Sequence, residues 1–135
     1  MSPIAATRAE MGVLGAIIID PEAISAVAAI VEPADFGQPR LRLVYEAALG
    51  LHARGIAPDY VTLCGELETR GTMAAVGGDH VLTGLINYCP TSLHAEHYAR
   101  VVAESGGGAV AGARRRDAVL ATYAFPQPGV GGVVD

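Results

Sequence analysis

The stretch Arg42–Gly71, with the sequence RLVYEAALGLHARGIAPDYVTLCGELETRG, decides the fold class of this chain. In its first half, Val44 and Ala48 lie four residues apart, which is the spacing of one face of a helix. Leu63 and Leu67 repeat this spacing in the second half. The stretch therefore predicts two short amphipathic helices joined by a tight connection.

Glycine and proline mark the ends of these two helices. Gly55 and Gly71 each follow an arginine, and a cation followed by a residue that tolerates positive φ is typical of a helix C-terminus. Pro58 cannot continue a helix because it has no amide hydrogen. Thr62 is then the expected N-cap of the second helix.

Toward the N-terminus, the sequence predicts two further helices. Residues 7–10, TRAE, fit a capping box that begins the first of them, and Gly12 within it allows another helix to approach closely. Asp20 is the expected N-cap of the second helix, and Pro33 is expected to end it. Phe36 follows among turn residues, where we expect it to anchor the loop to the core.

Toward the C-terminus, glycine runs separate the remaining segments. The turn at 76–79 leads into a short apolar helix, and a further helix begins near Leu93. Residues 105–108, SGGG, break that helix because each interior glycine costs about 1 kcal/mol. One more helix is expected within 109–123. No segment alternates with the period of a strand, so the fold class is all-α.

Composition excludes several classes of function. The chain has 135 residues, a net charge of -5 and a sequence pI near 5.2, which disfavours a nucleic-acid-binding surface over the whole domain. All nine basic residues are arginine, so the lysine that a P-loop or a Schiff-base enzyme requires is absent. There is no signal peptide or membrane-spanning apolar run, and Cys64 and Cys89 form no disulfide framework. We therefore expect a cytoplasmic protein.

Two constellations support alternative functions. Cys89, His94 and His97 offer three zinc ligands, although their spacing matches no established metal motif. Arg114–Arg116 offers a basic cluster for nucleic acid, although such a cluster is usually a solvated helix face. The alternatives are thus a helical nucleic-acid-binding regulator and a small metal-binding protein. No residues are arranged for catalysis or for a cofactor.

An ordered series of short motifs runs along the chain. They are AEMGVLGA (9–16), DPEAI (20–24), PADF (33–36), VYEA (44–47), RG (54–55), DYVTL (59–63), ELE (66–68), VGG (76–78), PT (90–91) and HYARVV (97–102). Each motif alone is weak, but the ordered set closely resembles the N-terminal domain of the DnaB family of bacterial replicative helicases. The resemblance covers residues 9 to about 104.

The resemblance implies an architecture and a division of the chain. The fold is a globular bundle of about five to six short helices followed by a helical hairpin, which the glycine run alters or truncates. Residues 1–104 correspond to the family's domain, 105–124 to the altered hairpin or last helix, and 125–135 to a Pro/Gly-rich linker or disordered tail. The family's ATPase domain is absent, so we expect a non-catalytic chain without cofactors.

The resemblance also implies partners. In the family, hairpins of neighbouring subunits pair, six copies build a collar, and the collar docks primase and, in some systems, a helicase loader. Here an apolar seam is expected to mark an interface and to form a homodimer. Its residues are Tyr98, Val101, Val102, Val119 and Leu120. Direct binding of nucleic acid is expected to be weak or absent.

Overall fold

The computed structural model describes residues 3–88 and 94–105. These residues form seven α-helices and two short 3-10 helices, with no strand among them. In chain order the elements are α1 (Pro3–Ile19), η1 (Pro21–Ala23), α2 (Ile24–Ala28), η2 (Pro33–Asp35), α3 (Pro39–Ala53), α4 (Tyr60–Thr69), α5 (Met73–Val76), α6 (His80–Tyr88) and α7 (Ala95–Ser105). The all-α expectation is confirmed, and α5 is a helix that the sequence did not predict.

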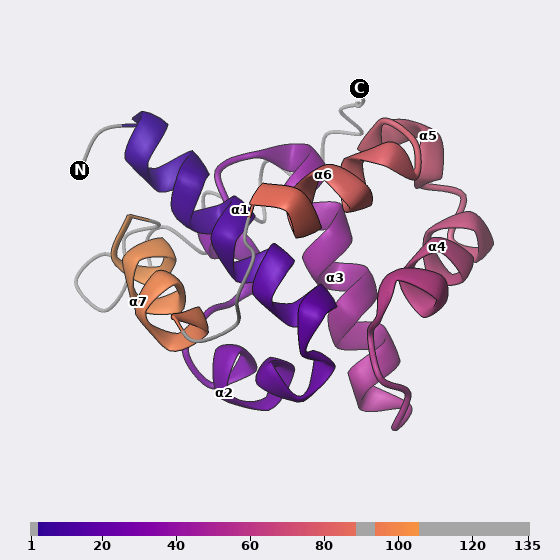
Figure 1. Cartoon of the computed structure of the whole chain (residues 1–135), viewed down its shortest axis with the longest axis horizontal. Coiled ribbons are helices and arrows are strands. Elements are labelled where there is room, and N and C mark those ends of the chain that lie inside the picture. Colours follow the sequence, from indigo (N-terminus) through magenta and orange to yellow (C-terminus); the bar gives the residue numbers. More distant parts are fainter. Residues whose placement is uncertain (1–2, 89–93, 106–135) are drawn as a thin grey trace.

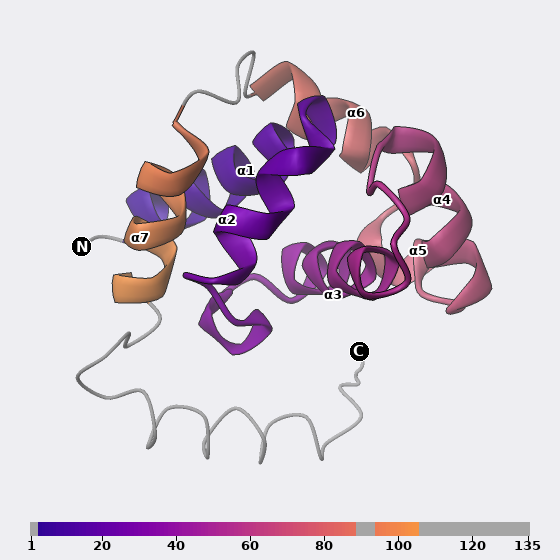
Figure 2. The same ribbon diagram turned by 90° about the horizontal axis from the view of Figure 1, so that it is seen from below.

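Helix α1 lies at the centre of the bundle and packs against α7, α6 and α3. Figures 1 and 2 show α7 on one side of α1, whereas α4 and α5 lie at the opposite end, beside α3. The run 12–18 of α1 is buried throughout, as is typical of a helix that is apolar on all faces. None of the described helices is long and apolar enough to cross a membrane.

Tyr45 of α3 joins the segment after α2 to the core. Its side chain is fully buried, and its hydroxyl donates a 2.7 Å hydrogen bond to the carbonyl oxygen of Val31. The ring of Phe36 stacks on the Tyr45 ring with centroids 4.8 Å apart, so the expected anchoring role of Phe36 is confirmed. Burial, together with the nearby carboxylates of Asp35 and Glu32, raises the pKa of Tyr45.

The capping box expected at residues 7–10 is wrong. Helix α1 already begins at Pro3, so these residues lie inside it. Glu10 instead accepts hydrogen bonds from the backbone amides of Gly37, at 2.9 Å, and Gln38, at 3.2 Å. A carboxylate that is only 3% exposed requires such donors, and here they come from a distant loop.

Asp59, and not Thr62, is the N-cap of α4. The Asp59 carboxylate accepts from the amide of Thr62, and the Thr62 hydroxyl accepts from the amide of Asp59, both at 2.9 Å. Thr62 therefore takes the third helical position of a capping box. The sequence placed the start of the helix too late because both residue types are good N-caps.

Three other predicted helix boundaries are confirmed and one is wrong. Asp20 is the N-cap of η1, which leads into α2, and its side chain accepts from the amide of Glu22. Gly55 and Gly71 have φ angles of 75° and 73°, as the C-terminal signals predicted. Helix α2 ends at Ala28, well before Pro33, so that expected boundary is wrong.

Candidate protein-docking surface

A depression of about 260 Å³ lies on the surface between α1, α6 and the start of α3. We call it the α1–α6 groove. Its lining is mainly apolar and consists of Thr7, Met11, Gln38, Arg40, Leu41, Val81, Gly84 and Leu85. The described lining residues include no pair of carboxylates, no nucleophile with a base and no cluster of metal ligands, so the groove suits the docking of apolar side chains.

One wall of the groove is the loop between η2 and α3, and Glu10 of α1 binds this loop. Because its carboxylate accepts from the backbone of Gly37 and Gln38, it fixes the loop that enters α3 against α1. The side-chain amide of Gln38 then donates to the hydroxyl of Thr7 at 3.3 Å, which joins two lining residues directly. The groove is thus bounded by a loop that two side chains of α1 hold in place.

Gly84 leaves the α6 side of the groove open. A Cβ atom added at this position would meet no atom within 4 Å. Leu41 and Leu85 form the floor, and both are buried in the core, at 7% and 2% exposure. A larger side chain at position 84 would therefore fill the groove without disturbing the core.

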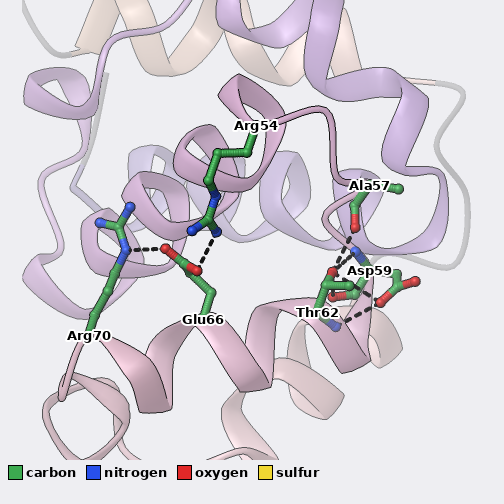
Figure 3. Close-up of polar contacts among 6 residues, drawn as sticks. All are labelled: Arg54, Ala57, Asp59, Thr62, Glu66 and Arg70. Atoms are coloured by element: carbon green, nitrogen blue, oxygen red, sulfur yellow. Dashed lines mark hydrogen bonds and ion pairs between the residues drawn. The ribbon is translucent and has the colours of Figure 1, made fainter.

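A polar cluster at the other end of the molecule joins α3 to α4. Glu66 of α4 accepts from Arg54 at 2.5 Å and from Arg70 at 2.7 Å, one arginine on each carboxylate oxygen (Figure 3). Arg54 and Arg70 are the C-cap residues of α3 and α4. We call these three residues the Glu66 clamp.

The Glu66 clamp ties the C-terminal ends of α3 and α4 together. Hydrogen bonds from Arg70 and Arg54 lower the pKa of Glu66, so the carboxylate stays ionised between the two arginines. Glu68 lies on the exposed side of the same helix, whereas Glu66 is buried. Arg70 passes over Gly50 of α3, where an added Cβ atom would force its guanidinium to shift.

The structure describes three of the five predicted interface residues, all on α7. Val102 is fully buried within the chain, and the ring of Tyr98 packs over Gly12 of α1. Val101 is half-buried. Val119 and Leu120 lie outside the described residues, so the predicted seam remains a prediction.

The residues of the two alternative functions are only partly described. His94 and His97 are exposed, and their rings lie 6.2 Å and 5.9 Å from the ring of Tyr98, measured between centroids. Cys89 and Arg114–Arg116 lie outside the described residues. Within residues 3–88 and 94–105, no three His, Cys, Asp or Glu side chains are close enough together to hold a metal ion.

Sequence reasoning missed the α1–α6 groove. Its residues come from three separate segments, and helical spacing does not show which segments meet. Two signals were present, namely a glycine at an exposed position in the middle of a helix, Gly84, and a cation in the first turn of another, Arg40. Glycine destabilises the middle of a helix, and a cation is unfavourable in its first turn. Residues that do not serve the stability of a helix often mark a functional surface.

Comparisons with known proteins agree with the fold. The family model of the DnaB-like helicase N terminal domain matches residues 2–104. The replicative DNA helicase DnaB of Mycobacterium leprae is 40% identical over 96 residues, which are 71% of this chain and 16% of that protein. The replicative DNA helicase DnaC of Bacillus subtilis is 38% identical over 97 residues, 72% of this chain and 21% of that protein. The chain thus spans about a fifth or less of the length of these curated relatives.

Two solved structures extend this agreement to three dimensions. The crystal structure of the N-terminal domain of DnaB helicase from Mycobacterium tuberculosis has a TM-score of 0.71 and 36% identity, covering 87% of this chain and 80% of that one. The N-terminal domain of DnaB helicase from Helicobacter pylori, whose structure was described with its interactions with primase, has a TM-score of 0.61 and 21% identity, covering 92% and 95%. The second likeness shows the fold alone. From the family match and the first structure, the chain belongs to the DnaB-like helicase N-terminal domain family.

Proposed function

We propose that this chain is a non-catalytic assembly and docking domain of DNA replication, which binds the C-terminal domain of primase in the α1–α6 groove. Family membership supports a role beside a replicative helicase. The groove is the observation that carries docking, because it is apolar, open and bounded by a fixed loop. The interaction of the Helicobacter pylori domain with primase favours primase as the partner. A helicase loader is the second partner that the family resemblance supports.

Gly84→Leu tests the groove directly. Leucine forms helices better than glycine by up to about 1 kcal/mol, so the change fills the groove without weakening α6. Gly65→Leu is the matched control, because Gly65 is also exposed within a helix and a Cβ there meets nothing within 4 Å. We expect calorimetry with the C-terminal domain of the cognate primase to show at least a roughly tenfold loss of affinity for Gly84→Leu and none for Gly65→Leu. Equal affinities for both variants would refute the site, and no binding by the wild-type chain would refute the partner.

Assembly is a second part of the proposal. Tyr98 and Val101 are only half-buried, so part of their apolar area stays exposed on α7, where a second copy of the chain would pack. We propose a homodimer in which Tyr98 and Val101 of two copies meet. Val102 packs beneath them in the core, and Val119 and Leu120 add further contacts. Light scattering at increasing protein concentration tests it.

We also expect the chain to have no ATPase or helicase activity of its own and little affinity for DNA. With no lysine in its sequence, it should not hydrolyse ATP or unwind DNA by itself. With a net charge of -5, it should bind duplex DNA weakly or not at all at physiological salt. We place it in the cytoplasm, where replication proceeds. An ATPase assay and a DNA titration test the first two statements.

A further inference from the structure

Among the described residues that line the α1–α6 groove, Arg40 is the one that carries a charge. Its side chain is exposed, and it has no ion pair with any residue of 3–88 or 94–105. Arg54 and Arg70, by contrast, are both bound to Glu66. The guanidinium of Arg40 lies beside the turn that precedes α6, with Nη1 3.3 Å from where a Cβ at Gly77 would be. A cation is thus held at the edge of an apolar groove without a counterion from the described chain.

The position of Arg40 does not serve the stability of α3. Arg40 follows Pro39 in the first turn of this 15-residue helix, where the helix dipole disfavours a positive charge. The N-cap residue Gln38 makes no side-chain capping hydrogen bond to α3, because its amide is directed to Thr7. A carboxylate brought from outside would therefore be favoured both by the guanidinium and by the start of the helix.

We infer that the α1–α6 groove selects an amphipathic helix of a protein partner, with apolar side chains that fill the groove and an Asp or Glu that pairs with Arg40. The inference rests on the proposed function and defines the chemistry of its partner. A helix fits because the groove is lined by helices, and no sheet edge exists among the described residues to receive a strand. A protein fits better than nucleic acid because one cation beside apolar walls, on a chain with a net charge of -5, offers little to a phosphate backbone.

Charge variants of the full 135-residue chain test this inference. The probe is the C-terminal domain of the cognate primase, and the variants are Arg40→Gln and Arg40→Glu. We expect affinity to fall about tenfold for Arg40→Gln and further for Arg40→Glu. The wild-type affinity should also weaken between about 50 and about 300 mM salt, and this salt dependence should be smaller in Arg40→Gln. Both variants should melt at or above the wild-type temperature, since they remove a cation from the start of α3.

Arg100→Gln is the matched control. It removes the same charge from an exposed position on α7, where Arg100 forms a solvent-exposed ion pair with Glu96 at 3.6 Å. Its affinity for the primase domain should equal that of the wild type. A scan of Asp→Lys and Glu→Lys changes in the primase domain should contain one variant that binds Arg40→Glu better than it binds the wild-type chain.

The outcomes separate this inference from the proposed function. If Gly84→Leu blocks binding but Arg40→Glu binds like the wild type, the groove is the site and the carboxylate partner is wrong. If the wild-type chain does not bind the primase domain, the proposed function fails and the inference fails with it. If the wild-type chain instead binds duplex DNA and Arg40→Glu does not, the groove recognises phosphate and the inference is overturned.

Discussion

Helices α7 and α4 lie at opposite ends of the molecule and are attached to it in different ways (Figures 1 and 2). Helix α7 packs closely on α1, with Ala99 fully buried and the ring of Tyr98 directly over Gly12. Helix α4 contacts α3 through long side chains, among them the fully buried Leu67 and the carboxylate of Glu66. One attachment depends on close approach of backbones, and the other on side chains that reach across.

A glycine lies at each attachment, in a different role. Gly12 lets the ring of Tyr98 lie against the backbone of α1, since a Cβ there would come within 2.8 Å of its Cδ2 atom. Gly50 leaves the space through which Arg70 reaches Glu66. The same residue type thus brings two helices together at one end and makes room for an ion pair at the other.

The largest effect is expected at the α4 attachment. Leu67→Ala removes a fully buried side chain and leaves a cavity, which should lower the free energy of unfolding by about 2–5 kcal/mol. Thermal and urea denaturation measure the change. The matched control is Val61→Ala on the same helix, because Val61 is 73% exposed and its loss should change stability by about 0.5 kcal/mol or less. Equal melting temperatures for Leu67→Ala and the wild type would show that α4 is not packed as described.

The α7 attachment should be sensitive to the addition of an atom rather than to its removal. Gly12→Ala places a methyl group against the ring of Tyr98, and overpacking of this kind typically costs about 1–3 kcal/mol. Part of the cost is offset because alanine is the better helix former by about 1 kcal/mol. Gly84→Ala isolates this offset, since its methyl group meets no atom within 4 Å. We therefore expect denaturation to rank the variants with Gly84→Ala above the wild type and Gly12→Ala clearly below Gly84→Ala.

The two attachments also differ in how far the sequence predicted them. Leu63 and Leu67 were identified as core residues because their spacing defines a helix face, and both are buried. Gly12 was correctly read as a site of close approach, but nothing local identifies Tyr98 as its partner. Glu66 was not recognised as a clamp, because the reach of arginine side chains across two helices leaves no periodic signal in the sequence.

A long-range polar contact accounts for two of the errors, the capping box expected at residues 7–10 and the missed groove. Glu10 was assigned to a local capping box, yet its partners are the amides of Gly37 and Gln38, which lie 27 and 28 residues away. The same contact builds one wall of the α1–α6 groove. The groove was therefore hidden from the sequence for the same reason that the capping box was wrong, since local patterns do not reveal which distant backbone amides a carboxylate will meet.

Substitutions on α7 test the proposed homodimer. Val101→Asp places a carboxylate on a half-buried position, and we expect a folded chain, less stable by about 1–2 kcal/mol, that light scattering finds to be a monomer. Val102→Asp should instead unfold the chain, because Val102 is fully buried. Arg100→Asp, at an exposed neighbouring position, should leave the dimer intact. A wild-type chain that stays monomeric at high concentration would contradict the proposed dimer.

The smallest effect is expected from the charge of Glu66, and only in acid. Because the hydrogen bonds of Arg70 and Arg54 lower the pKa of Glu66 below its ordinary value of 4.5, the unfolded chain binds more protons at this residue than the folded chain. This contribution to stability is therefore complete above pH 4.5 and is lost as the pH falls through the folded-state pKa. In Glu66→Gln it should be absent at every pH, so the wild type and the variant should converge in stability as the solution is acidified.

Glu68→Gln is the control for this pH dependence. Glu68 lies on the same helix, but it is exposed and has no ion pair with a described residue. Its variant should follow the wild-type curve of unfolding free energy against pH. If Glu66→Gln also followed that curve with a constant offset, the clamp would act through shape and hydrogen bonding alone. The α4 attachment would then resemble that of α7, where contact between uncharged groups holds the helix in place.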